Sequence, residues 1–348
     1  MEALLPVILI LAGFYVGWNI GANDAANCIG TTVGARIVSY RKAVILMTCC
    51  VIIGGVLQGQ HVMKTVGKGI VLADAETWEA HHDSPAGPEF AQLFPDNRLP
   101  DRAILIALIS AGLFVTVSTL SSLPVSTSQA MVGSVAGAGI GIVGFQASYF
   151  KLLVLAKIAA AWLISPLLTL LLAFALHSLL QRQLHRIPSL YASRYLGWLV
   201  LASSAYTSYS LGANDLGNAV GPLLARYPDH GAWLALAGGG AMAVGAWTLG
   251  ARVTETVGSR ITDLDYSSAL SAQFSAAFGV HLFTLAGVPV STSQAVVGGI
   301  IGVGLTGGSR AIHRSALRRI FAGWVLTPLC AGMLAAALYH LSSLLLGQ

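Results

Sequence analysis

The chain has 348 residues, of which 55% are hydrophobic and only 9% are charged, and its mean hydropathy is +0.74. Soluble domains carry about 25% charged residues, so this composition excludes an ordinary soluble protein and indicates a chain that lies mostly in lipid. The formal net charge is +5 and the pI is about 9.1. In a membrane chain such an excess indicates basic cytoplasmic connections rather than a nucleic-acid partner.

Ten apolar runs, each near the length of a bilayer-crossing helix, follow one another along the chain. They cover residues 4–20, 43–60, 103–122, 129–145, 152–176, 195–211, 232–251, 268–288, 294–308 and 318–346. The sequence therefore predicts an all-α polytopic membrane protein. No positive segment precedes the first run, so we expect a retained helix rather than a cleaved signal.

Lys and Arg residues indicate which connections face the cytoplasm. The connections after the first, fifth, seventh and ninth runs hold twelve of them, and those after the second, fourth and sixth hold six. Because cytoplasmic connections are enriched in positive charge, we place the first group inside. This predicts a protein of the cytoplasmic membrane with both termini outside and with residues 71–102 as an outward loop.

Three motifs occur twice, in the same order. The pairs are GANDAAN at 21–27 and GANDLGN at 212–218, KTVGKGI at 64–70 and ETVGSRI at 255–261, and PVSTSQA at 124–130 and again at 289–295. The first two pairs are 191 residues apart and the third 165, and the predicted outward loop lies where the interval shortens. We predict a duplication with repeats 1–190 and 191–348. Five runs in each copy would invert the second copy, which is a transporter architecture built with broken or re-entrant helices around a midplane site.

Two acidic residues, Asp24 and Asp215, occupy equivalent places beside or within apolar runs, and Asn residues flank each of them. Buried carboxylates are costly in lipid and are usually functional. Gly and Asn-Asp favour turns, so we expect a helix break at each GAND motif, with freed carbonyls that line a cavity. Oxygen ligands of this kind suit Na⁺, although a carboxylate could carry a proton instead. The predicted Na⁺ ligands are Asp24, Asn27, Asp215 and Asn218, and the further cation-site candidates are Asn23, Asn214, Thr65 and Thr256.

The repeated PVSTSQA stretch matches a capping box, in which a Ser precedes a Gln by three residues at the start of a helix. We therefore expect helices to begin at Ser126 and at Ser291. A helix N-terminus carries unpaired N–H groups and partial positive charge, so it attracts anions. Two such ends that face one another predict an oxyanion site. Its candidate residues are Ser126, Thr127, Ser128, Gln129, Ser291, Thr292, Ser293 and Gln294.

The doubled GAND motif, the paired PVSTSQA and their order resemble the inorganic phosphate transporter family of secondary permeases, over nearly the whole chain. The resemblance implies an inverted-repeat helical bundle, often a homodimer. It also implies that the Ser/Thr-rich tips named above hold phosphate and that the paired Asp and Asn hold coupling cations. The tips read STSQ where many phosphate carriers resemble STTH, and related sulfate permeases share the STS tip. Sulfate therefore remains an alternative substrate.

Substrate and coupling follow from chemistry in this interpretation. Phosphate keeps an O–H near neutral pH and can donate it to a carboxylate, whereas sulfate cannot, so Asp24 and Asp215 favour phosphate. Importing a dianion against about 100 mV costs roughly 4.6 kcal/mol from the potential alone. We therefore predict at least two Na⁺ per phosphate, with proton coupling as the alternative.

Other classes of membrane protein fit the sequence less well. An anion channel would not need paired acidic residues within the membrane. A membrane enzyme would need a nucleophile or metal motif, and neither a G-x-S-x-G nor an H-E-x-x-H sequence occurs. We expect a transporter that needs no cofactor beyond its co-transported ion.

Overall fold

The computed structural model describes residues 4–34, 36–71, 92–94, 98–121, 125–184, 189–251, 265–306 and 314–346. Thr256 and most of the predicted outward loop 71–102 lie outside these ranges. The α-helices are α1 (Leu5–Gly34), α2 (Tyr40–Gln58), α3 (Gln60–Lys68), α6 (Asp101–Leu120), α7 (Thr127–Val143), α8 (Leu152–Leu184), α9 (Ser189–Arg226), α10 (Gly231–Gly245), α12 (Tyr266–Leu285), α13 (Thr292–Thr306) and α14 (Arg314–Leu346). Short 3₁₀ turns lie at Ala147–Tyr149 and Pro228–His230, and a π-helical turn at Ala246–Gly250 continues α10.

Within the described ranges, six helical stretches are long and apolar enough to cross a membrane: Leu5–Gly34, Tyr40–Gln58, Asp101–Leu120, Leu152–Leu184, Pro228–Gly250 and Phe321–Leu345. The prediction of an all-α multi-pass membrane protein is confirmed. Two of the ten predicted runs, 129–145 and 294–308, instead form the short helices α7 and α13, which have 17 and 15 residues. At a rise of 1.5 Å per residue, such helices are too short to cross the roughly 30 Å hydrocarbon core.

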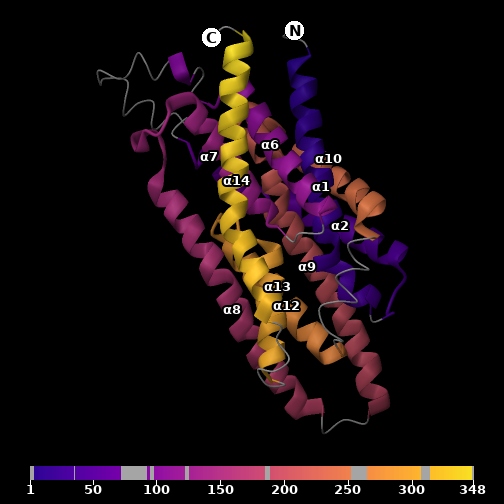
Figure 1. Cartoon of the computed structure of the whole chain (residues 1–348). Helices are drawn as coiled ribbons and strands as arrows, with labels where there is room; N and C mark the ends of the chain where they lie inside the picture. The colour runs from indigo at the N-terminus through magenta and orange to yellow at the C-terminus, as the bar shows by residue number, and fades with distance from the viewer. Residues whose placement is uncertain are drawn as a thin grey trace.

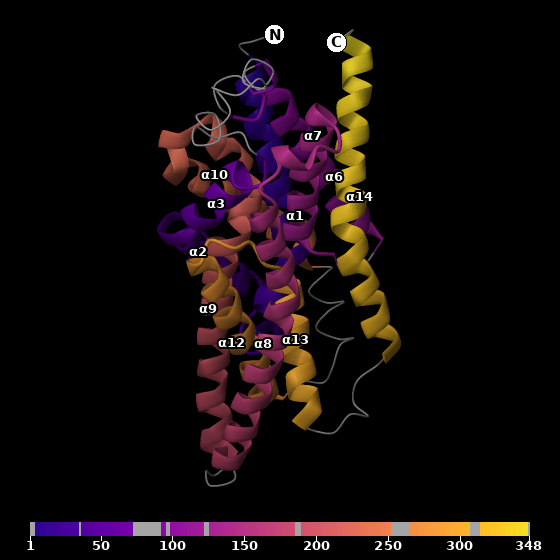
Figure 2. The ribbon, with the colours of Figure 1, turned by 90° about the vertical axis from the view of Figure 1, so that its left-hand side faces the viewer.

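Each short helix folds back against the helix that precedes it, so α6–α7 and α12–α13 are two hairpins. Figure 1 shows the α6–α7 hairpin in the half of the bundle that carries both termini, and the α12–α13 hairpin in the opposite half. Each hairpin packs against a long helix from the other part of the sequence, α7 along α14 and α13 along α8. Figure 2 shows these two pairings from the side.

Glycines allow both pairings. A Cβ atom at Gly133 of α7 would lie 2.3 Å from the Pro328 carbonyl oxygen of α14, and one at Gly298 of α13 would lie 2.2 Å from the Pro166 carbonyl oxygen of α8. Gly298 follows Gly133 by the same 165 residues that separate the two PVSTSQA stretches. The two hairpins therefore pack in equivalent ways.

The predicted helix breaks at the GAND motifs are wrong, because α1 and α9 continue through them without interruption. The glycine of each motif serves close helix crossing instead. A Cβ at Gly21 would lie 1.9 Å from the Met242 carbonyl oxygen, and one at Gly212 would lie 2.0 Å from that of Val51. Packing of small residues at helix crossings overrides the local preference of Gly-Ala-Asn-Asp for a turn.

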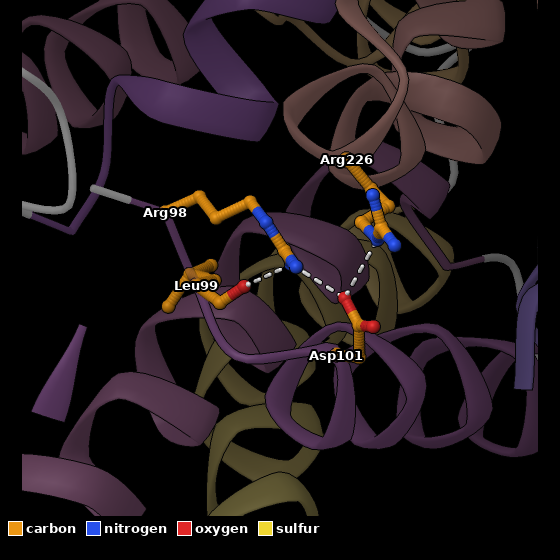
Figure 3. Close-up of polar contacts among 4 residues, drawn as sticks. All are labelled: Arg98, Leu99, Asp101 and Arg226. Carbon is orange, nitrogen blue, oxygen red and sulfur yellow. Dashed lines mark hydrogen bonds and ion pairs between the residues drawn. The ribbon is translucent and has the colours of Figure 1, made fainter. Parts of the chain in front are cut away.

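An ion-pair cluster joins helix ends near the termini (Figure 3). Asp101, the first residue of α6, accepts from Arg98 Nη1 at 2.5 Å, and Arg226 Nε at the end of α9 lies 3.4 Å from the same carboxylate oxygen. Arg98 also donates to the Leu99 carbonyl. An acid in the first turn of a helix is favourable for the helix dipole, so the cluster fixes the start of α6 against the end of α9.

Candidate functional site

The two hairpin tips begin their short helices as the sequence predicts. Ser126 accepts a hydrogen bond from the Gln129 backbone N–H at 3.2 Å, and Ser291 accepts one from Gln294 N–H at the same distance. In both cases only this half of the capping box forms, because the glutamine side-chain oxygens have no hydrogen-bond partner among the described residues. Each tip therefore begins a helix and carries one buried amide oxygen that has no partner among the described residues.

Asp24 of α1 is 1% exposed and is surrounded by donors. Its Oδ1 accepts from Asn27 Nδ2 at 2.8 Å, from Ser293 Oγ at 3.0 Å and from Asn23 Nδ2 at 3.3 Å, while Oδ2 accepts from Thr127 Oγ1 at 3.2 Å. The hydroxyl partners come from both hairpins. One aspartate of α1 therefore brings the two tips together.

Asp215 of α9 is fully buried and repeats this arrangement from the other side. Its Oδ1 lies 3.0 Å from Ser128 Oγ, 3.2 Å from Asn218 Nδ2 and 3.4 Å from Thr127 Oγ1, and its Oδ2 accepts from the Thr292 hydroxyl. Thr127 thus lies between the two carboxylates. Two carboxyl groups, both buried, are thus linked through one hydroxyl at the centre of this cluster.

The second serine of each PVSTSQA stretch contacts the aspartate that lies in the other part of the sequence. Ser293 of the α12–α13 hairpin contacts Asp24 of α1, and Ser128 of the α6–α7 hairpin contacts Asp215 of α9. Ser128 Oγ also lies 2.7 Å from the Val290 carbonyl, which ties one tip directly to the other. Four of the eight predicted tip residues, namely Thr127, Ser128, Thr292 and Ser293, are therefore in contact with the two acids in one cluster.

The flanking asparagines divide into two kinds. Asn27 and Asn218 each contact the nearby aspartate and a tip serine. Asn23 and Asn214 contact no tip hydroxyl among the described residues and hold the hairpins: Asn23, which also donates to Asp24, accepts from Thr119 at 3.4 Å, and Asn214 Nδ2 donates to Thr284 at 2.9 Å. These two threonines were not among the sequence-predicted residues, although they too are 165 residues apart and of one type.

Thr65 lies outside this cluster. Its hydroxyl donates at 2.6 Å to the carbonyl of Gly287, a residue with φ of +69° in the turn that leads to the second tip. The structure therefore gives Thr65 a packing contact with the hairpin connection rather than a contact with either carboxylate. Thr256, its counterpart, lies outside the described residues.

Three buried acceptor oxygens at the tips and on α9 have no donor among the described residues: Gln129 Oε1, Gln294 Oε1 and Asn218 Oδ1. A buried unpaired carbonyl oxygen costs about 1–3 kcal/mol. Hard monovalent and divalent cations bind such oxygens together with carboxylates. The tips and α9 therefore carry both donors that fit an oxyanion and acceptors that fit cations.

Comparison with known proteins identifies relatives of this chain. The family model for the phosphate transporter family matches residues 20–335. A protein named phosphate permease in Methanocaldococcus jannaschii is 32% identical over 92% of this chain and 93% of its own length. The chloroplastic inorganic phosphate transporter 2-1 of Arabidopsis thaliana is 26% identical over 93% of this chain and 70% of its own.

A solved structure described as the sodium-dependent phosphate transporter has the same fold. It superposes with a TM-score of 0.83 at 26% sequence identity, covering 98% of this chain and 99% of that one. The family match spans both GAND motifs and both tips, which are the segments that build the buried cluster. By its sequence, its fold and the residues at its centre, this chain belongs to the phosphate transporter family.

Proposed function

We propose that this chain is a Na⁺-coupled symporter that imports inorganic phosphate across the cytoplasmic membrane by alternating access. The observation that carries the proposal is the contact of two buried aspartates with the hydroxyls of two helix N-termini. The carboxylates accept hydrogen bonds from hydroxyls that could instead donate to an anion. A bound oxyanion would take over these donors.

Phosphate suits this cluster better than sulfate. Both anions would gain from the N-termini of α7 and α13 and from neutral hydroxyl donors. Only phosphate brings an O–H that Asp24 or Asp215 can accept; sulfate would place oxygens without protons beside two buried negative charges. The names of the relatives and of the similar solved structure support the same substrate.

Charge balance at this depth requires cations. A phosphate dianion with Asp24 and Asp215 would bring four negative charges together where water is excluded. Protons could neutralise the carboxylates, but they would leave the amide oxygens of Gln129, Gln294 and Asn218 unpaired. Na⁺ neutralises charge and also satisfies such oxygens. We therefore infer that at least two Na⁺ accompany each phosphate, with Asn27 completing the ligand set.

Alternating access follows from the repeats. The crossing of α1 with α10 at Gly21 and the crossing of α9 with α2 at Gly212 use residues that are 191 positions apart. We infer two inverted repeats, 1–190 and 191–348, that rock about the central cluster. From the connections rich in Lys and Arg we infer that the end of the bundle away from the termini faces the cytoplasm.

Uptake by purified protein in liposomes tests the proposal. We expect radiolabelled phosphate to accumulate under an inward Na⁺ gradient, and sulfate to accumulate far less. Phosphate uptake that ignores the Na⁺ gradient but follows a proton gradient would reject Na⁺ coupling. Accumulation of sulfate in preference to phosphate would reject the substrate.

A further inference from the structure

A second buried polar cluster lies away from the aspartates, in the half of the bundle opposite the termini. At its centre is Gln273 of α12, which is 2% exposed. Its Oε1 accepts from Thr31 Oγ1 at 2.9 Å and from Ser203 Oγ at 3.0 Å. Its Nε2 donates to Ser204 Oγ at 3.1 Å and to the Cys28 carbonyl. One side chain therefore joins α12 to both helices that carry the aspartates.

Further bonds complete this cluster. Ser204 donates to the Cys28 carbonyl at 2.8 Å, and the hydroxyls of Ser204 and Thr32 are hydrogen-bonded to each other. We call these residues the Gln273 layer: Cys28, Thr31, Thr32, Ser203, Ser204 and Gln273. On α1 the layer begins four residues beyond Asp24, so it closes the site toward the end of the bundle away from the termini (Figure 1).

The repeat offsets identify the corresponding layer in the other half, and it is apolar. Offsets of 191 residues for α1 and α9 and of 165 for the hairpins give the Leu108 layer: Ala12, Gly13, Leu108, Ala219, Pro222 and Leu223. The contacts correspond as well as the numbers. A Cβ at Gly13 would lie 2.5 Å from Leu223 Cδ1 and 3.2 Å from the Ala219 carbonyl oxygen, where Ser204 meets Thr32 and Cys28 in the other half.

We propose that the Gln273 layer is a hydrated gate, through which phosphate and cations pass between the site and the end of the bundle opposite the termini. This inference rests on the proposed transport function. When helices separate, hydroxyl and amide groups can exchange their mutual hydrogen bonds for bonds to water at small net cost. The leucines of the other layer lose their burial without such compensation. We therefore expect the Gln273 layer to hydrate at a lower free-energy cost than the Leu108 layer.

Exposure of the site residues agrees with this direction. Asn27 and Ser293, on the side of the Gln273 layer, are partly exposed, whereas their counterparts Asn218 and Ser128 are fully buried. Thr31 of the layer itself is also partly exposed. Asn23 is partly exposed as well, while Asp24 and Asp215 themselves stay buried, so the site is closed but less deeply covered around Asp24.

Thiol labelling can test the gate, because the chain has its own reporter. Cys28 lies in the Gln273 layer, and its repeat counterpart is Ala219 in the Leu108 layer. In a background with Cys49, Cys50 and Cys330 replaced by serine, we would compare native Cys28 with a Cys28→Ala, Ala219→Cys double variant. The reagent is a small cationic methanethiosulfonate, applied to protein in lipid nanodiscs, where both faces are accessible.

We expect the thiol at position 28 to react at least about tenfold faster than the thiol at position 219, since water enters only the polar layer easily. Equal rates would overturn the proposal. The labelling experiment requires neither phosphate nor Na⁺. If the protein takes up no phosphate in liposomes but the two thiols still react at different rates, the transport proposal is rejected and the difference between the layers stands.

Two substitutions of Gln273 distinguish a hydrated gate from a purely structural link between the helices. Gln273→Leu makes the layer resemble its apolar counterpart, and Gln273→Glu places a charge there that requires water. A gate predicts slower labelling of Cys28 with leucine and faster labelling with glutamate. If Gln273 only holds the helices together, both variants loosen them and both speed labelling, which would contradict the proposal. Because the comparison of positions 28 and 219 leaves Gln273 intact, it stands even if neither variant folds.

Discussion

The two hairpin tips have the same seven-residue sequence, yet their surroundings differ. Ser128 is fully buried and lies against the backbone of the other tip, whereas Ser293 is partly exposed. Outside the tips the divergence grows, from hydrogen-bonded Gln273 in one half to packed Leu108 in the other. The residues that we propose bind the ions are alike in both halves, whereas those of the Gln273 and Leu108 layers differ. The proposed binding residues are therefore symmetric between the two halves, and the proposed access routes to the site are not.

The largest effects are expected where the halves are alike. Asp24→Asn and Asp215→Asn should each lower Na⁺-driven phosphate uptake by about 100-fold or more, because each removes a charge that accepts several hydrogen bonds. Uptake assays in liposomes would measure this, with Asp229→Asn at an exposed turn as the control. Normal transport by either variant would remove that carboxylate from the mechanism.

The glycines at the two helix crossings test whether these crossings are equivalent. Gly21→Ala and Gly212→Ala each force a methyl group to within about 2 Å of a carbonyl oxygen. We expect each to lower the midpoint of thermal unfolding in detergent by roughly 5 °C. Gly240→Ala on α10 is a matched control, since its Cβ would meet no atom of the described residues within 4 Å. A tolerated alanine at only one crossing would mean that the two crossings are not equivalent.

These crossings also mark where sequence reasoning failed. The helix starts at Ser126 and Ser291 could be predicted, because capping patterns are local signals. The GAND motifs were expected to break their helices, because Gly and Asn-Asp favour turns when considered alone. The carbonyls of Met242 and Val51, more than 200 and 160 residues away, are what these glycines accommodate. Such distant partners leave no local trace.

The Gln273 layer was also not foreseen. Its serines and threonines are spread over α1 and α9, where single hydroxyls commonly bond to their own helix, as Ser203 does to the Val200 carbonyl. The repeat comparison that exposed the tips relies on identical residues. A search for identical residues does not find pairs of positions with different residues, such as Leu108 and Gln273. Such pairs are the ones that distinguish the two halves.

Ser128→Ala and Ser293→Ala would sharpen the difference between the tips. Both lose a hydroxyl beside a carboxylate, but water can replace it only at the partly exposed Ser293. We expect the apparent KM for phosphate to rise about tenfold for Ser128→Ala and about threefold for Ser293→Ala. Thr48→Ala, whose hydroxyl bonds only to its own helix, serves as a control. Equal effects at both serines, or a larger effect at Ser293, would contradict the asymmetry of access.

The smallest effect is expected at the ion pair that begins the α6–α7 hairpin. Asp101 begins α6, and the residue 165 positions later, at the start of α12, is Tyr266. Because the side chains of this cluster are 16–37% exposed, water screens the pair and its contribution is at most about 1 kcal/mol. Asp101→Asn should therefore lower the unfolding midpoint by no more than about 2 °C and leave phosphate uptake unchanged. A large loss of uptake without a loss of stability would mean that the cluster takes part in opening the end near the termini, and that the apolar Leu108 layer is not the only seal there.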